Sequence, residues 1–236
     1  MQVLIAGCVL GWSLTVLVVR ADGLEPETGV FAGYGPPDPY DLLLRRTLLQ
    51  DDNYRLCQMV TIPSFFKESA VYMLRQSDGT ATVVSRTLKS QLWGKMQKRI
   101  QKASKDPDSY SLGAESQAAA LQGLIPKVES HIAPLDSETA ALLADTCRAV
   151  LLQVHHIEKT STGFDGTTYH AGHWVPGAFL SGTTWSPKEG TIASEFVAME
   201  EVLKSFADSP FDRRDAIRAD LISKATRLGE RVAPPK

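Results

Sequence analysis

Three short runs of residues that favour strands follow one another between residues 55 and 86, with no helical pattern between them. The second and third runs are separated by Ser77-Asp78-Gly79. Asp-Gly between two such runs is typical of a hairpin, because glycine tolerates the positive φ that the tight turn requires. Strands grouped in this way, rather than alternating one by one with helices, favour an α+β fold with an antiparallel or mixed sheet.

Helical periodicity and capping residues mark the segments around these runs. Asp38 followed by Pro39 predicts a helix start, and apolar residues repeat at helical spacing further along the chain. The expected helices cover residues 39–50, 89–105, 136–156, 191–206 and 210–228, and a short alanine-rich helix stays open within 106–123. LIPKVESHI and the segment 164–185 supply further candidate strands. We therefore expect one α+β domain with an antiparallel or mixed sheet of about five to six strands, packed with about four to five helices.

The first nineteen residues carry no charged side chain and are followed by Arg20, Ala21 and Asp22. An apolar segment that ends in small residues, here Val19 and Ala21, is typical of a cleaved export signal. An uncleaved membrane anchor and lipid modification of Cys8 are the alternatives. The expected organisation is a signal peptide at 1–21, an extended Gly/Pro-rich segment at 22–38, the α+β domain at 39–230 and a flexible tail at 231–236.

Loss of the leader leaves two cysteines, Cys57 and Cys147, in a compartment that favours oxidation. A disulfide between them would close a loop of about ninety residues and stabilise the fold by roughly 4 to 5 kcal/mol in the chain-entropy model. Two buried free thiols are the alternative, because Cys147 falls on the apolar stripe of its expected helix and buried cysteine packs as a small hydrophobe.

Charge and motifs narrow the function classes. The net charge of -2 lacks the basic excess of nucleic-acid binders, so we expect no nucleic-acid partner. The sequence contains no P-loop, dinucleotide fingerprint, H-E-x-x-H helix, EF-hand loop or C-x-x-C unit, which removes the enzymes that depend on those signatures. We expect no cofactor and no bound metal.

The segment FDGTTYHAGHWVPGAFLSGTTW gathers many side chains that can carry chemistry. A metal pair at His170 and His173 is disfavoured, because side chains alternate along a strand and the two imidazoles would face opposite sides of the sheet. A nucleophilic site would combine His170 as base with Ser181 or Asp165, although no G-x-S-x-G elbow surrounds Ser181. The simplest interpretation is a hairpin of two strands joined by the Val-Pro-Gly-Ala turn.

Two groups of residues are candidates for binding a partner. Aromatic residues are common at interfaces, and the first group consists of Tyr169, His173, Trp174 and Trp185. The second group is basic, because the chain from Arg86 to Lys105 contains seven basic residues and no acidic one. On a helix, four of them form a stripe that could bind an anionic polymer, a phospholipid surface or an acidic protein face; these are Lys95, Lys98, Arg99 and Lys102.

A solvated outer face is the alternative for the basic stripe, near the acidic side of the later helix at Glu195, Glu200 and Glu201. The leader, together with the lack of a convincing catalytic arrangement, favours binding over catalysis. We expect an exported protein, periplasmic or secreted, that binds another protein or an anionic envelope polymer, as an inhibitor or immunity-type factor would. It would meet a membrane only through an uncleaved leader. The rival functions are an envelope hydrolase that uses His170 with Ser181 or Asp165, and a structural envelope component.

Overall fold

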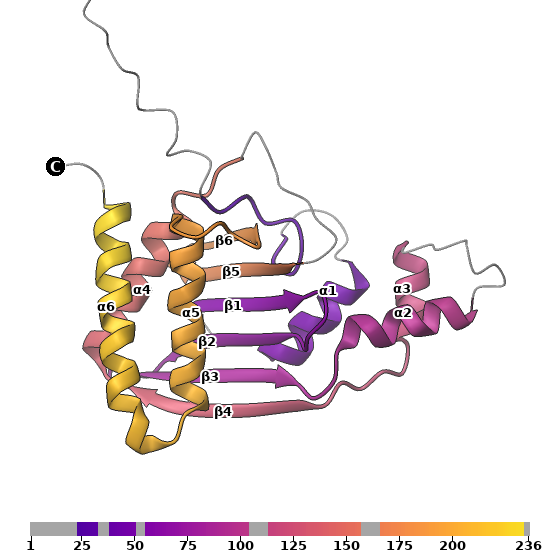
Figure 1. Ribbon diagram of the computed structural model, residues 1–236, viewed down its shortest axis with the longest axis horizontal. Coiled ribbons are helices and arrows are strands. Elements are labelled where there is room, and N and C mark those ends of the chain that lie inside the picture. Colours follow the sequence, from indigo (N-terminus) through magenta and orange to yellow (C-terminus); the bar gives the residue numbers. More distant parts are fainter. Residues whose placement is uncertain (1–22, 33–37, 51–54, 104–112, 157–165, 234–236) are drawn as a thin grey trace, which may run out of the picture.

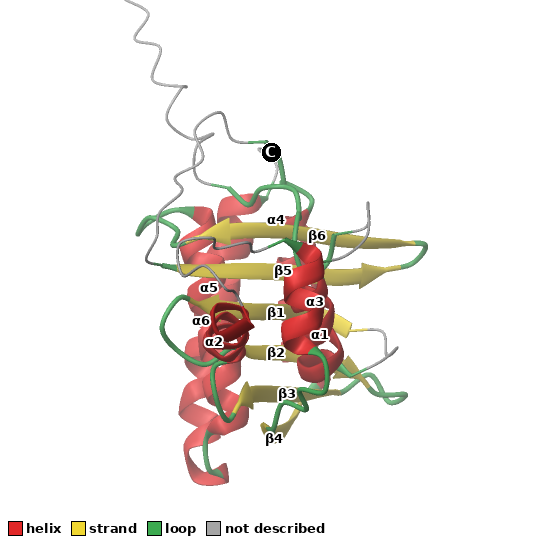
Figure 2. Cartoon of the chain, turned by 90° about the vertical axis from the view of Figure 1, so that its right-hand side faces the viewer, coloured by secondary structure: helices red, strands yellow, loops and turns green. Residues whose placement is uncertain are grey.

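A computed structural model of the protein describes residues 23–32, 38–50, 55–103, 113–156 and 166–233. Within these residues the chain forms a single α+β domain in which one sheet of six strands lies between helices (Figures 1 and 2). The expected α+β class is therefore confirmed. The expected signal peptide lies outside the described residues, and so does Asp165.

Every pair of neighbouring strands in the sheet is antiparallel, in the order β4-β3-β2-β1-β5-β6. Glycines with positive φ occupy two of the hairpin turns, with 86° at Gly79 and 81° at Gly177, as the turn sequences predict. The strands are β1 (Arg55–Pro63), β2 (Ser69–Arg75), β3 (Ala81–Leu88), β4 (Val128–Leu135), β5 (Thr167–Val175) and β6 (Ala178–Trp185).

Three helices cover one face of the sheet (Figure 1): α4 (Ser137–Leu151), α5 (Ile192–Asp208) and α6 (Arg214–Val232). Polar side chains fix where two of them begin. The Asp136 carboxylate accepts a hydrogen bond from the backbone N–H of Thr139, and Thr191 forms a capping box with Ser194. Alternate strand residues point into this larger core and pack against apolar helix positions; they include Met59, Met73, Val83 and Ala171.

The opposite face is covered by α1 (Pro39–Leu44) and a π-helical turn, η2 (Arg45–Leu49). Beside them lie α2 (Leu92–Ala103) and α3 (Ala114–Leu121), which extend past the strand ends (Figure 1). Figure 2 looks onto this end of the molecule, with α2 seen nearly along its axis. The described residues thus contain six α-helices, whereas the sequence predicts four to five, and α3 is the one that its alanine-rich sequence left open.

Part of the Gly/Pro-rich segment belongs to the packed domain. Glu25 forms a two-residue bridge with Thr183 of β6, with backbone hydrogen bonds of 2.8 Å in both directions. Leu24, Val30 and Phe31 are buried. At the other end of the chain, α6 continues to Val232, into the stretch expected to be a tail.

A disulfide joins Cys57 of β1 to Cys147 of α4. Of the two interpretations that the sequence leaves open, the structure therefore has the bridge. Both cysteines also lie among buried apolar residues, so the bridge ties the central strand to the helix layer from inside the core.

The fully buried carboxylate of Glu68, in the connection between β1 and β2, holds the start of α2. It accepts hydrogen bonds from the backbone N–H groups of Leu92, at 2.9 and 3.0 Å to its two oxygens, and of Trp93, at 2.8 Å. The Tyr40 hydroxyl of α1 donates a third, at 2.8 Å. A negative charge at a helix N-terminus is favourable, because unpaired N–H groups and the helix dipole meet there. One side chain therefore connects the strand ends to two helices.

Replacing Glu68 with alanine is expected to lower the free energy of unfolding by about 3 kcal/mol or more, because it leaves a hydroxyl and two backbone N–H groups without their acceptor. Glu68→Gln keeps one acceptor oxygen and should lose less. Urea denaturation followed by circular dichroism measures both variants. The exposed Glu129→Ala is the matched control and should change stability by no more than about 0.5 kcal/mol. A Glu68→Ala variant as stable as the control would show that the carboxylate is not the cap.

Candidate binding surface

His170, the candidate base, lies buried on the face of the sheet covered by α1. Its Nδ1 is 2.7 Å from Oε1 of Glu27, and both side chains are shielded from solvent. Gly29 lies close against the Cε1 edge of the ring, because a Cβ at that position would lie 2.6 Å from His170 Cε1. Burial also raises the pKa of the neighbouring Asp41 carboxyl to about 6, and the charge of His170 opposes that rise. The imidazole thus anchors the N-terminal segment to β5.

The structure does not pair Ser181 with His170 as the suggested nucleophilic site would require, and Asp165, the other candidate partner, lies outside the described residues. His170 pairs with Thr183 in the sheet, whereas Ser181 pairs with Gly172, so the serine is offset along the strands by two residues. Such diagonal neighbours have Cα atoms about 7 to 8 Å apart. Among the described residues, the hydrogen-bond partner recorded for His170 is Glu27 rather than Ser181.

The two histidines of the segment face opposite sides of the sheet. His173 is buried on the α4 side of the sheet, where the charges of Arg148 and Asp145 shift its pKa in opposite directions. Burial lowers the pKa of His173 to about 4, with the positive charge of Arg148 adding to the effect. His173 is therefore neutral at physiological pH.

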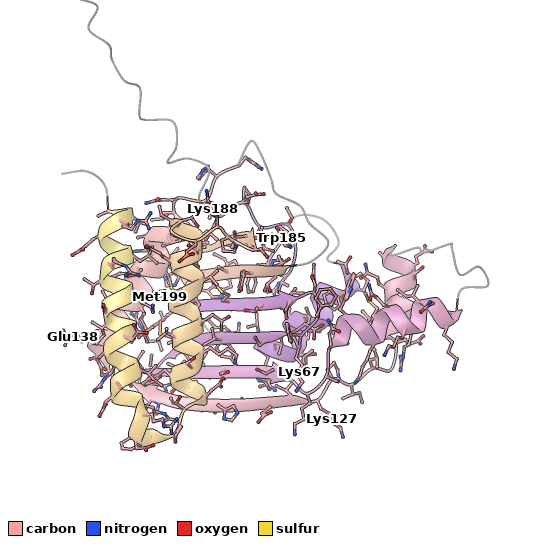
Figure 3. The ribbon with its side chains drawn as sticks, viewed as in Figure 1. Lys67, Lys127, Glu138, Trp185, Lys188 and Met199 are labelled. Carbon is pink, nitrogen blue, oxygen red and sulfur yellow. A yellow bond between two sulfur atoms is a disulfide. The ribbon has the colours of Figure 1, made fainter. Side chains whose placement is uncertain are left out.

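The four aromatic-group candidates do not share one surface. Tyr169 packs against the larger core and His173 is buried. Trp174, 37% exposed, contacts Phe179 on the other face, with ring centroids 4.9 Å apart. Trp185 lies on the same face as Trp174 but near the other end of the hairpin (Figure 3), about 20 Å away at the usual rise per residue.

The basic residues of α2 have two kinds of surroundings, because Arg99 is hydrogen-bonded to α3 and the three lysines are exposed. Arg99 donates to the carbonyl oxygens of Ala120 and Gln122, each at 3.0 Å, and so binds the C-terminal end of α3. Lys95, Lys98 and Lys102 are exposed. The acidic residues of α5 are no counterpart for them, because that helix packs on the other face of the sheet.

A second group of lysines continues this charge across the strand ends. Ser69 pairs with Thr87 and Leu88 pairs with Val128. Beyond the last of these pairs, the Lys89 N–H donates to the Lys127 carbonyl at 2.8 Å. Continued past the strand ends, this antiparallel register sets Lys67, Lys89 and Lys127 side by side on three successive chain segments. All three are exposed, and Figure 3 shows Lys67 and Lys127 at this end. We call these residues the lysine row.

Two adjacent phenylalanines stand beside the lysine row. Phe65 and Phe66, in the connection between β1 and β2, are 69% and 75% exposed. The Gln91 side chain, just before α2, donates to the Ser64 carbonyl at 2.8 Å. Gln91 precedes the exposed lysines of α2 at helical spacing, so their stripe leads to this loop. The Phe–Lys end consists of Phe65, Phe66, the lysine row and the stripe of Lys95, Lys98 and Lys102.

Among the described residues, none of the six lysines of the Phe–Lys end forms an ion pair with a carboxylate. Their positive charge is therefore not neutralised by a neighbouring acidic side chain in the part of the chain that the structure describes. The exposed carboxylate of nearby Glu129 instead lies beside His131, with 3.5 Å between Glu129 Oε1 and His131 Nε2. Like charges opposite one another across strands are destabilising, and large exposed apolar groups favour a binding role when they cluster. The Phe–Lys end is therefore the strongest candidate for a binding surface.

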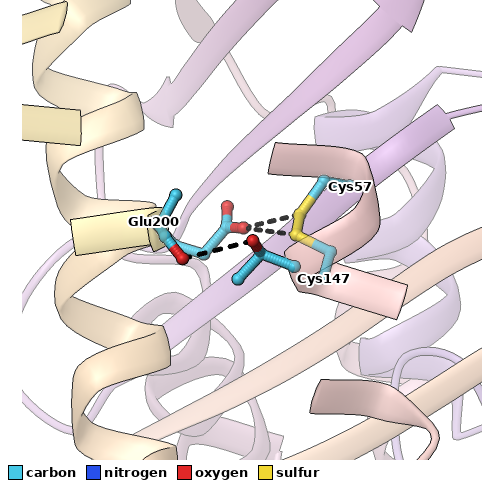
Figure 4. The surroundings of a disulfide bond; sticks show 5 residues. Cys57, Cys147 and Glu200 are labelled. Carbon is cyan, nitrogen blue, oxygen red and sulfur yellow. Dashed lines mark hydrogen bonds between the residues drawn. A yellow bond between two sulfur atoms is a disulfide. The ribbon is translucent and has the colours of Figure 1, made fainter. Parts of the chain in front are cut away.

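A buried acid lies beside the disulfide (Figure 4). Oε1 of Glu200 on α5 is 2.8 Å from Cys57 Sγ and 3.4 Å from Cys147 Sγ. Burial raises the pKa of Glu200 to about 8, and the charge of Glu201 adds to the rise. Because a disulfide sulfur carries no proton, a hydrogen bond between these groups requires a protonated Glu200 as donor. The raised pKa provides that form at neutral pH.

Among the described residues, the side chains of Cys57, Cys147 and Glu200 are grouped as metal ligands would be. Their sulfur and carboxylate oxygen atoms all lie within 4.8 Å of one another. Thiolates, not disulfides, bind such ions. With the sulfurs joined, this cluster offers only the glutamate oxygen as a ligand.

Sequence reasoning missed several of these residues. Phe65 and Phe66 were detectable, because two aromatic residues stand where turn residues are expected, directly after Pro63 and Ser64. Glu27, Lys67 and Lys127 gave no local signal, since the residues beside which they lie are distant in sequence. Glu200 was expected on the acidic side of its helix, but its side chain is buried.

Comparisons of the chain with protein-family models, with curated proteins and with solved structures find no match. In the described parts of the chain, no helix combines the length and apolar character needed to cross a bilayer.

The stability of the protein should depend on pH through Glu200. Its pKa is near 4.5 when unfolded and about 8 when folded, so the contribution of the neutral acid is complete below about pH 4.5 and is lost as pH rises toward 8. At about 1.4 kcal/mol per pH unit, the loss is roughly 4 to 5 kcal/mol.

Urea denaturation between these pH values measures the change in the free energy of unfolding. Glu200→Gln should flatten its pH dependence, because the amide does not ionise. Glu138→Gln, on the exposed side of α4, is the control and should keep the slope of the unaltered protein. Equal slopes for all three proteins would refute a role for Glu200 ionisation.

Proposed function

We propose that this is an exported binding protein that docks on an anionic partner through its Phe–Lys end. The observation that carries the proposal is the lysine row beside Phe65 and Phe66, exposed and without a carboxylate ion pair among the described residues. This arrangement contributes little to the fold, because the lysines repel one another and the phenylalanines leave apolar surface in water. A partner with negative charge and an apolar contact would offset both effects.

Two observations support the exported location. The uncharged leader of nineteen residues has the pattern of an export signal. The disulfide between Cys57 and Cys147 is of the kind that persists in oxidising compartments such as the periplasm and the extracellular space.

The surroundings of His170 favour binding over hydrolysis. A general base needs access to the proton that it removes, whereas this imidazole is buried against Gly29 and held by Glu27.

Photochemical cross-linking in the producing cells tests the proposal. A photoreactive phenylalanine analogue at Phe66 is expected to form a cross-linked product in the exported fraction. The same analogue at Phe211, which is 84% exposed between α5 and α6, should form little. Mass spectrometry of the product identifies the partner class, and the N-terminal peptide reports leader cleavage.

Charge reversal provides the second half of this test. Changing Lys67, Lys89 and Lys127 together to glutamate should lower the cross-linking yield from Phe66 by about tenfold at physiological salt, because the partner's charge then repels the surface. Lys188→Glu, an exposed lysine on the loop before α5 (Figure 3), is the control. Equal yields from positions 66 and 211, or no effect of the triple reversal, would rule out the Phe–Lys end as the docking surface.

A further inference from the structure

We infer that the partner of the Phe–Lys end is an anionic phospholipid surface, which Phe65 and Phe66 enter while the lysines contact the headgroups. This inference rests on the proposed function and names its partner. It concerns the folded domain, and is independent of any membrane contact made by the leader.

The first argument is the exposure of the apolar side chains. Phe65 is 69%, Phe66 75% and Ile125 88% exposed, so each projects from the surface instead of lining a depression. Ile125 lies two residues from Lys127 and therefore next to the lysine row. Projecting apolar groups match a partner into which they can penetrate, and the headgroup region of a bilayer accepts phenylalanine in this way.

The second argument is the placement of charge around these groups. The lysine row lies across the ends of three chain segments, and the lysines of α2 extend from the same loop along a helix that projects past the strands. Lysine side chains can lay their methylene stems along an apolar layer while the ammonium group stays in water. Each basic residue near an anionic bilayer adds to the attraction. Basic groups therefore lie on either side of the loop that carries Phe65 and Phe66.

The third argument separates a bilayer from a soluble anionic polymer. A polymer without apolar surface would be bound by the lysines alone and would leave both phenylalanines in water. A protein partner would need a large, closely fitted contact, whereas the exposed apolar groups here are an adjacent pair on one connection and a single residue, Ile125, on another. The combination of two adjacent phenylalanines with six lysines fits a fluid surface that carries negative charge.

Vesicle co-sedimentation tests the inference on the full-length protein as the expressing cell exports it. The probes are vesicles of phosphatidylcholine mixed with phosphatidylglycerol, and vesicles of phosphatidylcholine alone. The protein should bind the anionic vesicles at least about tenfold more strongly. Phe65→Ser with Phe66→Ser should lower that binding about tenfold or more, and so should reversal of the lysine row to glutamate.

Matched variants control for the leader and for the fold. Phe211→Ser and Lys188→Glu should bind like the unaltered protein, and any contribution of the leader is common to all variants. Because the changed side chains are exposed, far-UV circular dichroism should be unchanged. In addition, Phe66→Trp should shift its fluorescence emission to shorter wavelength on anionic vesicles and not on phosphatidylcholine.

Three results would overturn the inference: equal binding to both kinds of vesicle, full binding by the Phe65→Ser, Phe66→Ser variant, or no emission shift from Phe66→Trp. If vesicle binding is absent but cross-linking from Phe66 still depends on the lysine row, the proposed function stands and its partner is a protein or a polymer. If both are absent, the proposed function fails as well.

Discussion

The carboxylate of Glu68 is the contact on which the arrangement of this end of the molecule depends. It lies in the short connection between β1 and β2, and its three donors come from the start of α2 and from Tyr40 of α1. The connection that carries Phe65 and Phe66 is therefore fixed to the helix that carries the lysine stripe. Two surface features from different parts of the chain become one surface because a single buried charge satisfies the helix N-terminus between them.

Much of the fold is predictable from local sequence. Gly79 marks a hairpin because its positive φ suits the turn, and Asp136 and Thr191 mark helix starts because their side chains accept hydrogen bonds from the first turn. Pro126 indicates that the fourth strand begins late, and β4 begins at Val128. The alanine-rich α3 was ambiguous, because small residues give little amphipathic contrast and its position depends on Arg99 and α1.

The candidate surface was much less predictable. The sequence reveals the lysines of α2 as a stripe, but it gives Arg99 the same status, although Arg99 is bound to the end of α3. Lys67, Lys89 and Lys127 lie far apart in the chain and meet only through the register of three strands. Register follows from the whole sheet and its buried face, so no local pattern contains it. The same holds for Glu27 and His170, whose contact spans 143 residues.

The two unusual electrostatic features of the molecule have opposite origins and lie in different places. The lysine row repels itself in water, and its charge is available because the side chains are exposed. Glu200 is held neutral because it is buried beside the disulfide, between the sheet and the helix layer. Ionisation of Glu200 as the pH rises toward 8 therefore removes stability from the core. The Phe–Lys end is thus carried by a framework whose stability falls as Glu200 ionises.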